Sequence, residues 1–115
     1  MIKRIESGPR YTQAVVYGKL VFLAGQVASD TSADVGGQTR QVLAAVERLL
    51  TAAGTDKTRI LSATVYLADM ANYAAMNQVW DAWVAPGATP ARATVEGKLA
   101  TPAYRVEVVV TAALP

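Results

Sequence analysis

The chain has 115 residues and a mass of 12.1 kDa, which is the size of one domain. It contains neither Cys nor His, which excludes thiol nucleophiles, disulfides, imidazole bases and metal sites built on those residues. The net charge is +2, without a run of Lys or Arg, so we expect no nucleic-acid surface. Charged residues make up only 17% of the chain and hydrophobic residues 52%, which favours self-association.

The beginning of the sequence shows no targeting signal. The first residues, MIKRIESGPR, lack the apolar core of a signal peptide. No apolar stretch approaches the roughly 20 residues that a membrane-spanning helix needs. There is also no repeat or linker, so we expect one domain over residues 1–115, located in the cytoplasm.

The first half of the chain predicts a hairpin followed by a helix. Residues 14–27 contain two β-rich runs around a turn at Gly18. Apolar residues then recur at helical spacing over residues 34–53. Either Ser32 or Asp34 can cap the start of this helix, and Gly54 is expected to end it.

The second half predicts three strands and one further helix. Residues 59–67 are rich in β-branched and aromatic side chains. Residues 72–84 follow as a helix that Asn72 caps, and its apolar stripe consists of Tyr73, Met76, Trp80, Trp83 and Val84. Strands over residues 91–99 and 105–113 complete the chain.

The resulting order, β-β-α-β-α-β-β, predicts an α+β fold. Two helices cannot cover both faces of a sheet of five or six strands, so they are expected to pack on one face. The fold class is therefore a two-layer arrangement of one mixed β-sheet and two helices. Since many residues of the opposite face are apolar or small, we expect that face to meet another subunit.

Charged residues in the last two strands are the first candidates for chemistry. Strand alternation places Arg92 and Thr94 on one face of the penultimate strand. Glu107 interrupts the apolar run at 106–110, and a charge buried there needs a partner or a function. One interpretation is a structural ion pair between Arg92 and Glu107, or an Arg92 that is simply exposed at the start of its strand; the other is a functional site.

Several motifs in order along the chain resemble those of one known family. The stretch P-A-R-A-T-V-E-G-K-L at 90–99, followed by V-E-V at 106–108, resembles the C-terminal signature of the RidA/YjgF/UK114 family. The Y-T-Q-A that starts at Tyr11 and the A-G-Q that starts at Ala24 resemble its N-terminal motifs. Asn77 falls where the family has an Asn on its second helix. The resemblance covers essentially the whole chain.

The resemblance implies a chorismate mutase-like fold and a homotrimer with pockets between its subunits. Active members of that family hydrolyse 2-imino acids, or their enamine tautomers, to 2-keto acids and ammonia, with neither cofactor nor metal. Arg92 matches the family's Arg, whose planar guanidinium can bind a substrate carboxylate with two hydrogen bonds. Glu107 matches the Glu that positions water. The family's substrate-binding positions match Tyr11, Ala24, Gly25, Asn77 and Thr94.

The sequence also departs from the family pattern. Ala24 stands where the active subgroup commonly has Ser, and Arg10 precedes Tyr11 as an additional cation. Arg10 is either solvated or suited to a substrate with an additional acidic group. The sequence leaves two other functions open, a non-catalytic binder of small carboxylates such as 2-keto acids and an RNA-acting protein.

Overall fold

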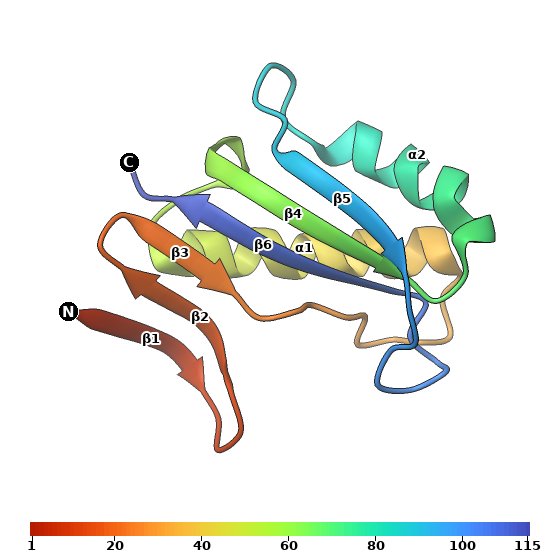
Figure 1. Ribbon diagram of the computed structural model, residues 1–115, viewed down its shortest axis with the longest axis horizontal. Coiled ribbons are helices and arrows are strands. Elements are labelled where there is room, and N and C mark those ends of the chain that lie inside the picture. The colour runs from red at the N-terminus through yellow and green to blue at the C-terminus, as the bar shows by residue number, and fades with distance from the viewer.

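The structure, a computed structural model, describes residues 1–115. One six-stranded sheet has the strand order β1-β2-β3-β6-β4-β5, and α1 lies behind it while α2 lies beside β5 (Figure 1). The predicted α+β class, with one mixed sheet and two helices, is confirmed. The elements are β1 (Ile2–Ser7), β2 (Thr12–Tyr17), β3 (Leu20–Leu23), α1 (Val35–Ala53), β4 (Ile60–Leu67), α2 (Tyr73–Trp83), β5 (Ala91–Glu96) and β6 (Val106–Ala113), with short 3₁₀ turns η1 (Lys57–Arg59) and η2 (Met70–Asn72).

Strand β1 was not predicted from the sequence. It pairs antiparallel with β2, and Ile5 lies opposite the buried Ala14. Lys3, Arg4 and Glu6 surround Ile5, so the segment shows little of the apolar alternation that identifies a strand. Charged residues are common on edge strands, where they prevent pairing with other chains.

Strand β6 lies in the middle of the sheet although it is the last element along the chain. It pairs antiparallel with β3 on one side and with β4 on the other. Strand β4 pairs in parallel with β5, and α2 forms the crossover between them. On β6 the buried residues alternate with half-buried ones, so Val106, Val108 and Val110 face the helices.

Helix α1 has the predicted cap and stop. The Asp34 carboxylate accepts a hydrogen bond from the Gly37 amide at 2.8 Å, which satisfies one free donor of the first turn. Ser32 is not the cap, because its hydroxyl donates to Asp30 instead. Gly54 ends the helix with φ of 92°, a left-handed conformation that favours glycine.

Helix α2 starts differently from the prediction. The Asn72 side chain makes no capping hydrogen bond; instead Asp69 caps the preceding turn η2 by accepting from the Ala71 amide. The predicted apolar stripe is confirmed at Trp80, which is buried. Tyr73, also assigned to that stripe, is exposed.

The two faces of the sheet differ in how they are covered. The helix-covered face holds the core, whereas large apolar side chains remain exposed on the other face, as the sequence predicted. They include Tyr17, Leu20, Phe22 and Val95. No helix has both the length and the apolar character needed to cross a bilayer.

Candidate active site

Arg92 lies in a polar and aromatic cluster between β5 and α2. Its Nη1 donates a hydrogen bond to Asn77 Oδ1 at 2.8 Å. Its guanidinium carbon lies 5.0 Å from the centre of the Trp80 ring, in the range of a cation–π contact. The side chain is half-buried, and β5 is the edge strand of the sheet.

The fold explains why these residues meet. Arg92 lies in register with the buried Ala63 of β4, so its side chain projects toward the helix layer. Asn77 and Trp80 are three residues apart on α2 and share the face above it. Tyr73, four residues before Asn77, places its hydroxyl 3.5 Å from Arg92 Nη2.

The positive charge of Arg92 is not compensated within the chain. The two ion pairs of the structure, Glu6–Arg48 and Lys57–Glu47, lie elsewhere. Arg92 is therefore oriented by neutral partners, and a guanidinium carries five donors, more than these partners use. A half-buried cation with free donors favours an anion as its ligand, such as a carboxylate or a phosphate.

Glu107 lies on the other face of the sheet, packed against a glycine. Its neighbours Val106 and Val108 are buried under the helices, so the Glu107 side chain points to the open face. A Cβ atom added to Gly25 would lie only 2.1 Å from Glu107 Oε2. Only a residue without a side chain therefore fits at position 25 while the carboxylate holds this place.

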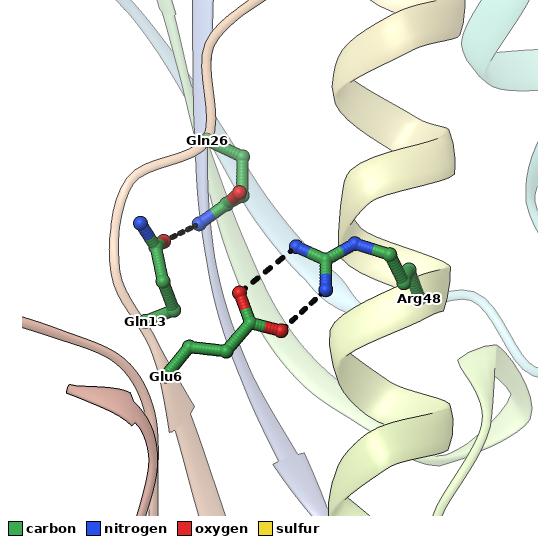
Figure 2. A network of polar contacts seen from close by, with 4 residues as sticks. All are labelled: Glu6, Gln13, Gln26 and Arg48. Carbon is green, nitrogen blue, oxygen red and sulfur yellow. Dashed lines mark hydrogen bonds and ion pairs between the residues drawn. The ribbon is translucent and has the colours of Figure 1, made fainter.

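The segment around Gly25 is held between β2 and β6. The Ala24 amide donates to the Gln13 carbonyl at 2.8 Å, and the backbone of Gln26 exchanges two hydrogen bonds with Val108. Figure 2 shows the side chains of Gln13 and Gln26 pointing toward one another, with a 2.9 Å hydrogen bond. These bonds fix the backbone on which the Glu107 carboxylate rests.

The turn between β1 and β2 adjoins this segment and carries Tyr11. The Gly8 amide donates to the Tyr11 carbonyl at 2.9 Å, and Tyr11 itself is 59% exposed. At the base of the turn, Glu6 forms an ion pair with Arg48 of α1 (Figure 2). The Arg48 hydrogen bond lowers the pKa of the Glu6 carboxyl below its ordinary value.

The predicted ion pair between Arg92 and Glu107 is wrong within one chain. The two strands are consecutive in sequence, but β4 lies between them, and the two side chains project to opposite faces. Arg92 is in register with Ala63, and Glu107 with Tyr66. Two strand spacings and three residues of rise along the strand place the two Cα atoms about 14 Å apart.

The predicted site residues therefore form two groups. The Arg92 group contains Asn77 and, two residues along β5, Thr94, whose hydroxyl is buried without a hydrogen-bond partner. The second group, on connected backbone, contains Tyr11, Ala24, Gly25 and Glu107.

Two aromatic contacts of Arg92 were not predicted from the sequence. Both Trp80 and Tyr73 were assigned from the sequence to the apolar stripe of the second helix. Their spacing from Asn77, three residues after and four before, would have placed all three on one helix face. This spacing is the sequence pattern from which the aromatic contacts of Arg92 could have been predicted.

Comparisons with known proteins agree over the full length of the chain. The sequence model of the family described as Endoribonuclease L-PSP matches residues 1–114. The chain belongs to this family. A RutC family protein from Haemophilus ducreyi is 48% identical over 99% of the chain and 97% of its own length. The RutC family protein YoaB from Escherichia coli is 39% identical over 98% of both chains.

Solved structures of the family have the same fold. A member of the YjgF protein family from Neisseria meningitidis is 47% identical and superposes with a TM-score of 0.98, covering 100% of this chain and 96% of its own. A YjgF/YER057c/UK114 family member from Mycobacterium tuberculosis is 26% identical with a TM-score of 0.89, covering 99% of this chain and 100% of its own. The family resemblance of the motifs is thus confirmed.

Proposed function

We propose that this chain is an enamine/imine deaminase that hydrolyses 2-imino acids to 2-keto acids and ammonia. One observation carries the proposal. Arg92 is half-buried, is held by Asn77 and Trp80, and has no counterion within the chain. A guanidinium arranged in this way is suited to a small carboxylate, the group that every 2-imino acid carries.

In this proposal Arg92 orients the substrate. Asn77 Oδ1 accepts one N–H of the guanidinium, and other N–H groups remain to bind both carboxylate oxygens. Trp80 covers one face of the guanidinium and restricts its rotation. The α-carbon of the substrate would then be held at a fixed distance from the attacking water, which reduces the entropy lost in reaching the transition state.

Glu107 would act as the general base and then as the general acid of the reaction. Water adds to the carbon of the protonated C=N bond while Glu107 accepts a proton from that water. Glu107 then returns the proton to the nitrogen of the carbinolamine, the C–N bond breaks, and ammonia leaves. The remaining hydroxyl gives its proton to the departing ammonia and becomes the ketone of the 2-keto acid, so protonated imine and water yield 2-keto acid and ammonium and the charges balance.

The separation of the two groups supports a pocket shared between subunits. Arg92 and Glu107 of one chain lie on opposite faces of the sheet, so they cannot act together on one small substrate. We propose a homotrimer in which Arg92 and Asn77 of one subunit meet Tyr11, Gly25 and Glu107 of the next. The open sheet face, with Phe22 43% exposed, offers the apolar surface for this association.

The activity can be tested with imines that are generated in situ in the assay. An amino-acid oxidase produces 2-imino acids in a buffered reaction, and their disappearance is followed with and without the protein. We expect the protein to accelerate the formation of 2-keto acid and ammonia. Binding of 2-keto acids without acceleration would instead identify a non-catalytic binder of small carboxylates.

The shared pocket is tested by mixing two inactive variants. Arg92→Ala and Glu107→Gln chains are unfolded together in equal amounts and refolded. If each pocket takes Arg92 from one subunit and Glu107 from the next, about one quarter of the pockets in random trimers are intact. If both residues act within one chain, no activity returns. Sedimentation should give about 36 kDa for three chains of 12.1 kDa.

A further inference from the structure

Arg10 is a cation with no assigned partner at the tip of the turn between β1 and β2. It is exposed, and neither ion pair of the structure involves it. The turn encloses a hollow of about 390 Å³, and Arg10, Tyr11 and Gln13 contribute to its lining. Arg10 therefore belongs to a concave part of the surface.

The charge of Arg10 stands uncompensated in this hollow. Glu6 is the one carboxylate that lines the hollow, and it is already paired with Arg48 of α1 (Figure 2). That pairing lowers the pKa of Glu6 and keeps it ionised, but its charge is directed to Arg48. The hollow therefore offers one free cation to an incoming anion.

The hollow adjoins the backbone that carries the Glu107 half of the proposed pocket. Tyr11 follows Arg10 directly, and the Gln13 carbonyl accepts a hydrogen bond from the Ala24 amide at 2.8 Å. Gly25 comes next and contacts the Glu107 carboxylate. Pro9 and the bond from the Gly8 amide to the Tyr11 carbonyl restrict the turn, so Arg10 is presented from a fixed backbone.

We propose that the substrates of this site are dicarboxylic 2-imino acids, with the α-carboxylate on Arg92 of one subunit and the distal carboxylate on Arg10 of the next. This inference rests on the proposed function and adds the class of substrate to it. Arg92 and Arg10 lie on different halves of the pocket, so each can bind one of the two carboxylates of the same substrate molecule. A second charge-assisted contact raises kcat/KM for such substrates, by about 5-fold at a site as open as this one.

The experiment compares kcat/KM for imines generated from aspartate and glutamate with that for imines generated from leucine and methionine. The wild-type protein should prefer the dicarboxylic pair. Arg10→Gln should lower the ratio between the two pairs of imines about 5-fold. Arg10→Glu should invert the preference, toward imines generated from lysine and arginine. Arg40→Gln, at an exposed position on α1, is the matched control and should leave the ratio unchanged.

The outcomes separate this inference from the proposed function. If imines are hydrolysed but neither Arg10 variant changes the ratio, the dicarboxylic assignment is overturned and the deaminase remains. If no imine is hydrolysed, calorimetry with 2-ketoglutarate and 2-ketobutyrate decides the assignment. Tighter binding of 2-ketoglutarate that is lost in Arg10→Gln supports it, and equal affinities overturn it.

Discussion

The two halves of the proposed pocket position their charges in different ways. Arg92 is held by side chains, since Asn77 accepts a hydrogen bond from its guanidinium and Trp80 covers its face. Glu107 depends on a glycine instead, since its carboxylate occupies the space that a Cβ at Gly25 would take. Substitutions of different size can weaken the side-chain contacts of Arg92 gradually. At Gly25, by contrast, even the Cβ of alanine would occupy the space that the Glu107 carboxylate needs.

Arg92→Ala should have the largest effect. Loss of the bidentate contact removes binding energy, and misorientation of the imine raises the barrier further, so hydrolysis should fall to the uncatalysed background. The readouts are kcat/KM and the sedimentation coefficient, which should stay at the wild-type value. Arg59→Ala, at an exposed position in η1, is the control. Near-native kcat/KM would remove Arg92 from carboxylate binding, and unfolding would make its role structural.

Glu107→Gln should have the second largest effect. The amide keeps the shape of the side chain but cannot accept the proton of water, so kcat should fall about 10²–10⁴-fold. Binding of a stable 2-keto acid, measured by calorimetry, should change far less. If binding and turnover were lost together, Glu107 would serve to shape the pocket. If turnover were unchanged, another group would position the water.

Gly25→Ala should have a smaller effect on the same half of the pocket. The new Cβ would lie 2.1 Å from Glu107 Oε2, so the carboxylate must move. A displacement of about 1 Å at a reacting group lowers kcat on the order of 10²-fold. Gly97→Ala is the matched control, because a Cβ there meets no atom within 4 Å. Equal kcat in the Gly25→Ala and Gly97→Ala variants would show that turnover does not depend on the position of the Glu107 carboxylate.

The smallest expected effect is on the stability of the fold at acidic pH, which depends in part on the Glu6–Arg48 ion pair. The folded state lowers the pKa of Glu6 through the Arg48 hydrogen bond. The stabilisation is therefore present above the unfolded pKa, near 4.5, and is lost as the pH falls through the lower folded value. Between pH 6 and pH 3, we expect the urea midpoint to fall further for wild type than for Arg48→Gln. Parallel curves for the two proteins would contradict the linkage.

The sequence predicted the layers of the fold better than the order of its strands. Hydrophobic periodicity gave the two helices and five of the six strands, because burial imposes those periods directly. The charged edge strand β1 has no such period and was missed. The position of β6 between β3 and β4 depends on pairing between distant segments, which no local pattern records.

The same limit explains what was predicted of the candidate site. The ion pair of Arg92 and Glu107 assumed that consecutive strands are neighbours, and β4 lies between them. The contact of Arg92 with Asn77 depends on the parallel pairing of β4 with β5 and on the crossover through α2. The match of Gly25 and Glu107 to functional positions came from the family resemblance, and the geometry now supplies its steric reason.

The central place of β6 also sets the order in which a newly made chain can fold. Strands β1 to β3 form a local meander, and β4, α2 and β5 form a second local unit, but no backbone ladder joins them without β6. Until residues 106–113 leave the ribosome, β3 and β4 each present an unpaired edge. Such edges are sites of aggregation, so the nascent protein should depend on chaperones until its last strand inserts.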